Sequence, residues 1–265
     1  MKTNNLVLAL VVALPFIVSV PNAIAATAEG VVLDPIHVDS GDTPSLQRGA
    51  SLFVNYCLSC HGAAYMRYER LAYDLDIPME TLAEEYMFTT DKPGDLMKTA
   101  MSEDDAKAWF GVAPPDLTLV SRVRKNDWLY TYLRAFYLDE NSPSGWNNSL
   151  FENVAMPHVL YELQGAQTLV GHVESSADES TEEHTANIGA HQNIVGDAIF
   201  EIQKVGKNTP EEFDTAMYDL VNFLSYLAEP AQLQRRSIGI WVLAWLVILF
   251  VVSYLLKKEY WRDVH

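Results

Sequence analysis

The sequence CLSCH at 57–61 constrains this chain more than any other feature. It contains both cysteines of the protein, with a histidine directly after the second. On a helical turn, residues three apart project from the same face. Thiols at Cys57 and Cys60 can therefore bond to the two vinyl groups at one edge of a porphyrin, and His61 can reach its iron. Because Cys-x-x-Cys-His is the attachment pattern of c-type haem, we predict one covalent haem c with His61 as an axial ligand.

Three other uses of these residues compete with haem attachment. A structural zinc site needs four ligands, and the sequence has no second cysteine pair. A redox-active dithiol requires only the two cysteines, which would leave the histidine without a role. A disulfide is the plain alternative in an oxidising compartment. The adjacent histidine and the missing zinc ligands favour haem over all three.

A six-coordinate haem that carries electrons needs a second axial ligand, and a methionine sulfur in that position raises the potential. Seven methionines follow the initiator, and most methionines fill the core. Met66 is too close to His61 in sequence to cross easily to the other haem face, and Met217 lies on an amphipathic stripe. Met156 lies in a loop far downstream, beside a proline, and is the predicted ligand. His158 is the nearest rival, and we expect it at the surface.

The N-terminus has the layout of a secretory signal peptide. Lys2 is the only charged residue before Glu29, an apolar run spans 6–20, and Ala-Ile-Ala ends at Ala25. A basic start, a short apolar core and a small-x-small cleavage site are typical of such signals. We therefore predict that residues 1–25 are a signal peptide. A membrane anchor is the alternative, but the run is short for a span and prolines break it.

The C-terminal segment 238–256 contains no charged residue and is predicted to be a transmembrane helix. As a helix it would be about 28 Å long, close to the hydrocarbon thickness of a bilayer. Lys257, Lys258 and Arg262 follow it directly. Basic residues remain preferentially in the cytoplasm, so we predict that 257–265 is a cytoplasmic tail and that the body lies outside. A buried core helix is the alternative for this segment.

The body between these ends, residues 26–234, is strongly acidic. It has 33 Asp and Glu against 12 Lys and Arg, a net charge of −21. Such a charge disfavours nucleic-acid binding and attracts basic protein partners, although solubility is the commoner reason for an acidic surface. The stretch 165–196 holds five of the acids and no aromatic residue. We expect it to be an acidic insertion, either an exposed excursion or a mobile loop.

Hydrophobic periodicity predicts a mainly α fold with long loops. A helix with Thr43 as its N-cap is expected to lead to Cys57, and further helices are expected near 102–111 and 127–138. The clearest helix follows Thr209, where Thr-Pro-Glu-Glu forms a capping box with proline at the first helical position. No alternating stretch is long enough to predict a sizeable sheet. The predicted architecture is a c-type cytochrome haem domain followed by one transmembrane helix.

Haem propionates are anionic and need basic partners near the pocket. Arg122 and Arg124 are two of the few basic residues in the acidic body, and they follow the double proline at 114–115. Either arginine could bind a propionate. An ordinary solvated arginine is the alternative for each of them.

Several further stretches, together with CLSCH, resemble the cytochrome c1 family, the haem subunits of quinol:cytochrome c oxidoreductase (complex III). These stretches are RYERL at 67–71, PPDL at 114–117, NVAMP at 153–157, VNFL at 221–224, AEP at 228–230 and LKKEYW at 256–261. They cover most of the mature chain in the order found in the family. Soluble c-type cytochromes have no counterpart of the last stretch.

The resemblance implies a protein of the bacterial inner membrane whose haem domain lies in the periplasm. It implies His61 and Met156 as the axial ligands. Of the two arginines, it favours Arg124 as the propionate partner. The other residues that it implies around the haem are Pro114, Pro115 and either Trp128 or Tyr130.

The resemblance also implies the partners. The chain would receive single electrons from a Rieske iron–sulfur subunit and pass them to a basic cytochrome c, either soluble or bound to the membrane. It would do so beside a cytochrome b subunit in a dimeric complex, as an electron-transfer subunit without bond chemistry of its own. Two rivals remain: a haem peroxidase or dehydrogenase, and a membrane-tethered cytochrome that works outside any complex.

Overall fold

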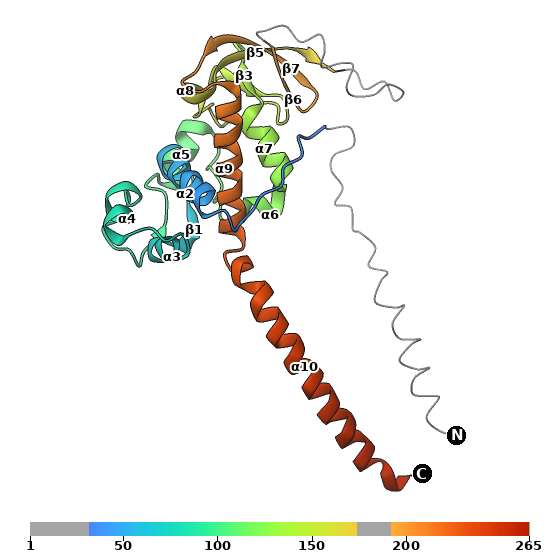
Figure 1. The fold of residues 1–265 in the computed structure, drawn as a ribbon. Coiled ribbons are helices and arrows are strands. Elements are labelled where there is room, and N and C mark those ends of the chain that lie inside the picture. The colour runs from blue at the N-terminus through green and yellow to red at the C-terminus, as the bar shows by residue number, and fades with distance from the viewer. Residues whose placement is uncertain (1–31, 174–191, 265) are drawn as a thin grey trace. The chain divides into compact units, whose positions relative to one another are not determined.

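A computed structural model describes residues 32–173 and 192–264 of the chain (Figure 1). The predicted signal peptide, 1–25, lies outside the described residues. Helices dominate the described part, as the sequence predicts. In chain order they are α2 Thr43–Leu52, a π-helix Phe53–Cys57, α3 Tyr68–Asp74, α4 Met79–Glu85, α5 Glu103–Phe110, α6 Val120–Arg124, α7 Asn126–Arg134, α8 Tyr161–Gln164, α9 Pro210–Ala228, α10 Gln232–Tyr260 and a short 3-10 helix Arg262–Val264.

Helix α9 is the element against which α2, α6 and α7 pack (Figure 1). Its predicted apolar stripe is buried in the main core: Phe213, Met217, Leu220, Val221, Leu224 and Leu227. The contact with α2 is close, because a Cβ at Gly49 would lie 2.1 Å from the carbonyl oxygen of Asp219. Only glycine allows this approach. The helix that delivers the chain to Cys57 is thereby fixed on α9.

The helix starts follow side-chain capping. At α9 the predicted capping box is present: the Thr209 hydroxyl accepts from the Glu212 amide at 3.2 Å, and the Glu212 carboxylate accepts from the Thr209 amide at 2.8 Å. At α2 the prediction of Thr43 as N-cap is wrong by one residue. The Asp42 carboxylate accepts from the Ser45 amide at 3.1 Å, so Asp42 is the N-cap and Thr43 is already helical.

Within residues 32–173 and 192–264, three small antiparallel sheets accompany the helices, and the sequence did not predict them. The strands are β1 Ala63–Arg67 with β2 Leu96–Met97, β3 Phe136–Leu138 with β4 Trp146–Asn148, and β5 Gly165–His172, β7 Ala198–Val205 and β6 Gln192–Val195 in the order β5-β7-β6. Strand β3 falls inside the helix expected at 127–138. That helix, α7, instead ends at Arg134, because the chain beyond it pairs with β4.

The expectation that 165–196 is wholly an exposed or mobile insertion is wrong at both ends. Strand β5 begins it and β6 ends it, and both pair with β7, all of which lies beyond this stretch. Val195 and Phe200 are buried in a second small core with Ala135. The strands were missed because their stability comes from partners outside the stretch. Residues 174–191, which carry the five acids, lie outside the described residues.

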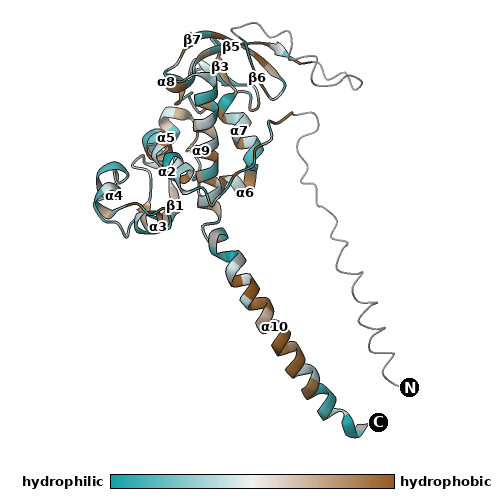
Figure 2. Cartoon of the chain, viewed as in Figure 1, coloured by the Kyte–Doolittle hydropathy of each residue, from teal (hydrophilic) through white to brown (hydrophobic). Residues whose placement is uncertain are grey.

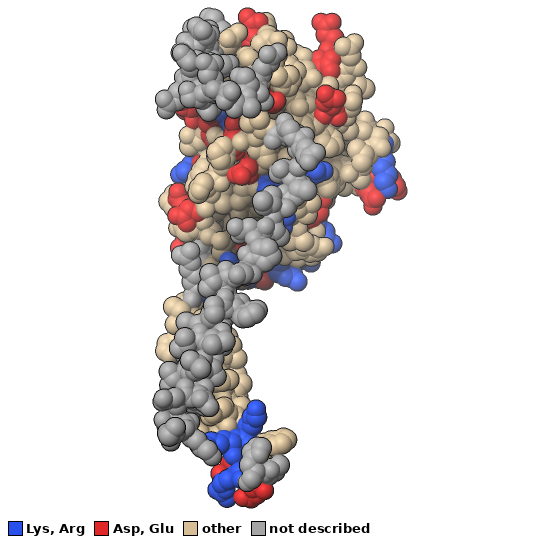
Figure 3. Space-filling view, turned by 90° about the vertical axis from the view of Figure 1, so that its right-hand side faces the viewer, with Lys and Arg blue, Asp and Glu red and all other residues tan. Residues whose placement is uncertain are grey.

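The last long helix contains a candidate membrane span, Ser237–Tyr260, with a mean hydropathy of 2.5. Its most apolar window is not buried against any described part of the chain. Figure 2 shows this window as a hydrophobic band along α10, and Figure 3 shows basic side chains at the C-terminal end of the helix, where Lys257 and Lys258 lie. The predicted span 238–256 falls within it. Because no described residue covers its apolar surface, the core-helix alternative fails for the described part of the chain, and a bilayer is the fitting environment.

Candidate haem site

One cavity of about 320 Å³ brings the predicted haem residues together. Cys57, Cys60 and His61 line it from the end of the π-helix and the turn that follows. Met156 lines the same cavity from the loop after β4. Most of the remaining lining is apolar, including Phe110, Val112, Leu117, Val120, Leu129, Leu133, Val154, Val159, Leu220 and Leu224. Two thiols, an imidazole and a thioether thus share one low-polarity space.

The two cysteines lie on one helical turn. The amides of Cys60 and His61 both donate to the carbonyl oxygen of Cys57, at 3.0 and 2.8 Å. Both thiols are free, so they do not form a disulfide. Burial raises the pKa of the Cys57 thiol to about 12. Because a redox-active dithiol depends on a lowered thiol pKa, this environment disfavours that use and suits two thiols that become thioethers.

His61 is held in one orientation by the double proline. Its Nδ1 lies 2.7 Å from the carbonyl oxygen of Pro115, and a carbonyl can only accept, so Nδ1 carries the proton. Burial lowers the pKa of His61, which favours the neutral ring. The lone pair of Nε2 therefore remains free to bind a metal. Pro114 and Pro115 also line the cavity.

Asp116 fixes the proline segment against the chain that follows His61. One of its carboxylate oxygens accepts from the Ala64 amide at 2.7 Å, and the other accepts from the Thr118 amide at 2.9 Å. The Leu117 amide donates to the carbonyl oxygen of Gly62 at 2.8 Å. These bonds make the carbonyl that orients His61 part of a rigid turn. Asp116 belongs to the PPDL motif, but the sequence alone did not predict a role for it.

Two buried asparagines hold the loop that carries Met156. The Asn148 side chain donates to a backbone carbonyl of α7 at 2.8 Å and accepts from the Phe151 amide at 3.2 Å. The Asn147 side chain accepts from the Asn153 amide at 2.9 Å. Neither residue was predicted from the sequence, because an asparagine-rich segment indicates a loop but does not indicate which backbone amides its side chains will bind.

One face of α7 supplies aromatic residues to the cavity. Trp128 and Tyr132 lie one turn apart, and their rings stack with centroids 4.8 Å apart. Both line the cavity, as does Arg124, whose guanidinium carbon is 4.9 Å from the Trp128 ring centroid. The Tyr132 hydroxyl lies 3.4 Å from the sulfur of Met156. Tyr132 was not predicted, although its spacing of four residues from Trp128 places it on the same helical face.

Two of the predicted pocket residues do not line the cavity. Arg122 forms an ion pair with Glu229 just after α9. Tyr130 lies beneath Arg134, whose guanidinium carbon is 4.4 Å from the ring centroid. Of the two predicted arginines, Arg124 lines the cavity. Of the two predicted aromatic residues, Trp128 does so.

His158 is not at the surface as expected, because only 2% of its surface is exposed. Its ring stacks on Phe136 with centroids 4.9 Å apart, and Trp146 meets it edge-on at 5.0 Å. Burial lowers its pKa to about 4. Two residues from Met156, it lies outside the cavity lining. The sequence prediction failed because the burial depends on β3 and β4, which the sequence did not reveal.

The buried His158 predicts a pH dependence of stability. In the unfolded chain this ring binds a proton below about pH 6.5. In the folded chain it binds a proton only below about pH 4. Stability is therefore lost as the pH falls through this window, by about 3 kcal/mol in total. We expect His158→Phe to reduce that loss, measured by denaturant unfolding of the detergent-solubilised protein at pH 7 and pH 4.5.

The matched control is His37→Asn, because His37 is exposed. Its pH slope should equal that of the wild type. An unchanged slope in His158→Phe would show that His158 does not control this part of the acid sensitivity.

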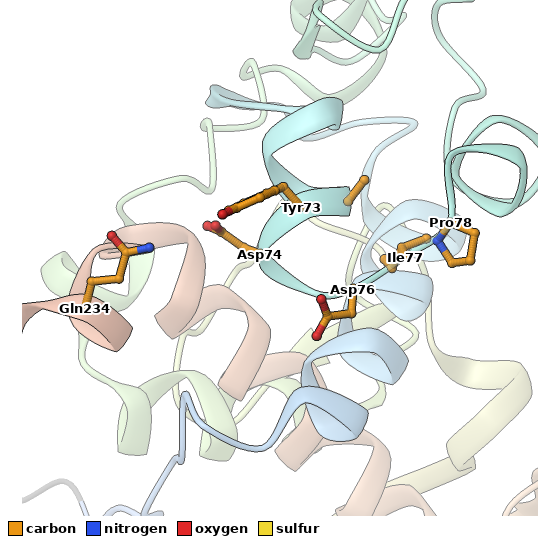
Figure 4. A pocket seen from close by; sticks show the side chains of 7 residues that line it. Tyr73, Asp74, Asp76, Ile77, Pro78 and Gln234 are labelled. Carbon is orange, nitrogen blue, oxygen red and sulfur yellow. The ribbon is translucent and has the colours of Figure 1, made fainter.

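A second hollow, of about 540 Å³, lies beside the loop between α3 and α4 (Figure 4). Its lining includes Asp74 and Gln234 and none of the predicted haem residues. The Asp74 carboxylate already accepts from Arg70 at 2.5 Å and from the Tyr226 hydroxyl at 2.9 Å. The larger hollow is therefore not the candidate haem site.

Two thiols, an oriented imidazole and a thioether around one apolar cavity, with a candidate membrane span after them, are the features of a membrane-anchored c-type cytochrome. The chain belongs to the Cytochrome C1 family, which it matches over residues 37–264. It is 48% identical to cytochrome c1 of Allochromatium vinosum, over 94% of this chain and 97% of that protein. The family resemblance inferred from the sequence is thereby confirmed.

Two further relatives have other names. The chain is 45% identical to a Nitrosomonas europaea protein named ammonia monooxygenase gamma subunit, over 91% of this chain and 92% of that protein. It is 26% identical to cytochrome b/c1 of Bradyrhizobium diazoefficiens, over 84% of this chain and 34% of that protein. Membership of this family makes the chain an electron-transfer haem protein.

Proposed function

We propose that the chain carries one haem c, attached through thioether bonds to Cys57 and Cys60, with His61 and Met156 as axial ligands. The observation that carries this proposal is the single cavity that all four side chains line. When bound, the haem supplies a one-electron redox couple. The cavity residues fit such a group, because the lining is apolar and the two thiols lie on one turn.

The other residues of the site have structural roles in this proposal. His61 presents Nε2 because the Pro115 carbonyl holds its Nδ1 proton. Arg124 is the propionate partner, and its position over Trp128 keeps the guanidinium at the cavity. The apolar lining excludes water and lowers the local dielectric, which together with a methionine ligand favours the reduced state of the iron.

We further propose the topology predicted from the sequence. Residues 1–25 direct export, 26–234 form a periplasmic haem domain, 238–256 span the bacterial inner membrane, and 257–265 remain in the cytoplasm. The uncovered apolar surface of α10 and the basic residues in its last turn support this orientation.

In this position the chain accepts single electrons from a Rieske iron–sulfur subunit and passes them to a cytochrome c. The net charge of −21 on 26–234 favours a basic acceptor, because opposite charges speed the encounter. A relative whose name joins cytochrome b and c1 supports a cytochrome b subunit as neighbour. We propose that these subunits form a dimeric complex.

The test is purification of the tagged chain in mild detergent, with identification of the co-purified subunits and a reduced-minus-oxidised spectrum. We expect a cytochrome b, an iron–sulfur subunit and a low-spin c-type haem. A chain that is isolated alone and remains stable would support the tethered cytochrome instead. A high-spin haem with an open iron position would support a peroxidase-type enzyme.

A further inference from the structure

The Met156 sulfur has a specific hydrogen-bond donor. The Tyr132 hydroxyl lies 3.4 Å from it, within the range for a bond to sulfur. In the part of the chain that the structure describes, no other hydrogen bond to this sulfur is present. The donor is therefore a single group that can be removed by deleting one oxygen atom.

The packing around Tyr132 aims the hydroxyl at the sulfur. Its ring is stacked on Trp128 and meets Phe136 edge-on, with centroids 5.2 Å apart. The Tyr132 carbonyl oxygen accepts from Asn148, the same asparagine that accepts from the Phe151 amide in the Met156 loop. Helix α7 and the Met156 loop are thus joined both by the Tyr132 hydroxyl and by the Asn148 side chain.

A thioether sulfur has two lone pairs, so it can accept a hydrogen bond and bind a metal at the same time. One lone pair accepts from Tyr132, which leaves the other for a metal. A hydrogen bond withdraws electron density from the sulfur and makes it a weaker donor. A weaker sulfur donor stabilises ferric iron less. The stabilisation of ferrous iron also falls, but by a smaller amount, so the potential rises. Hydrogen bonds to an axial ligand are therefore a lever on haem potential.

We propose that Tyr132 is a positioning residue for Met156, and that its hydroxyl raises the potential of the haem by donating to the sulfur. This inference rests on the proposed function, in which Met156 is an axial ligand. Its first test is Tyr132→Phe, which keeps the stacked ring and removes only the donor. In the intact complex, the midpoint potential should fall while the red absorption band of sulfur-ligated ferric haem persists at a shifted position.

A second variant changes the strength of the donor without removing it. Fluorotyrosine at position 132 has a more acidic hydroxyl and donates a stronger hydrogen bond, so the potential should rise. A ring that only fills space would not move the potential in opposite directions in the two variants. The matched control is Tyr137→Phe, which removes a hydroxyl from a tyrosine that lies outside the cavity lining. Its potential should equal that of the wild type.

The outcomes separate this inference from the proposed function. If Met156→Leu changes the potential but neither Tyr132 variant does, Met156 stays a ligand and the role of Tyr132 is overturned. If Met156→Leu leaves both the potential and the red band unchanged, the proposed ligand is wrong and this inference fails with it. A rise in potential in Tyr132→Phe would also overturn the inference.

Discussion

Replacement of Met156 with leucine is expected to lower the midpoint potential of the haem by about 0.1 V or more. Axial ligands set haem potentials over a range of about 0.8 V, and leucine cannot bind iron. The haem should stay covalently attached, because the proposed attachment is through Cys57 and Cys60 and does not involve the loop. Redox titration and the loss of the red absorption band would measure the effect in the purified complex.

Met217→Leu is the control for this substitution. Met217 is fully buried on α9 and does not line the cavity. Exchange of methionine for leucine in a core usually costs less than about 1.5 kcal/mol, so the domain should remain folded with an unchanged potential. If Met156→Leu behaved in the same way as this control, Met156 would not be an axial ligand.

Arg134→Met is expected to destabilise the haem domain by about 3 kcal/mol, the lower end of the range for breaking a buried ion pair. Arg134 is 7% exposed and lies between two carboxylates. It donates to Asp214 at 2.6 Å and to Asp34 at 2.6 Å. Methionine has a similar volume, but it removes the cation that both carboxylates share. The partial exposure of both aspartates explains why we expect the lower value.

The effect should also spread to the three-stranded sheet. The Asp34 carboxylate accepts from the Gly196 amide at 3.1 Å, in the turn between β6 and β7. Denaturant unfolding of the full chain in detergent would measure the loss. Lys107→Met breaks an exposed pair with Glu103 on one face of α5, and should cost about 0.5 kcal/mol or less. Equal losses in the two variants would contradict a structural role for Arg134.

The sequence by itself determined the features that depend on neighbouring residues. The spacing in CLSCH, the capping box at Thr209 and the uncharged run at 238–256 each lie within a few helical turns. Their chemistry is complete without knowledge of the rest of the chain. The fold confirms the capping box and places the uncharged run in one uncovered helix. It also sets the cysteines on one helical turn.

Only the tertiary structure decided which side chains face the haem cavity. Arg122 and Arg124 are two residues apart and have the same chemistry, yet the ion pair with Glu229 holds one of them away from the cavity. The burial of His158 depends on partners in β3 and β4. The hydroxyl of Tyr132 meets Met156 across a separation of 24 residues. These outcomes depend on packing between distant segments, and periodicity and spacing describe only segments that are continuous in the chain.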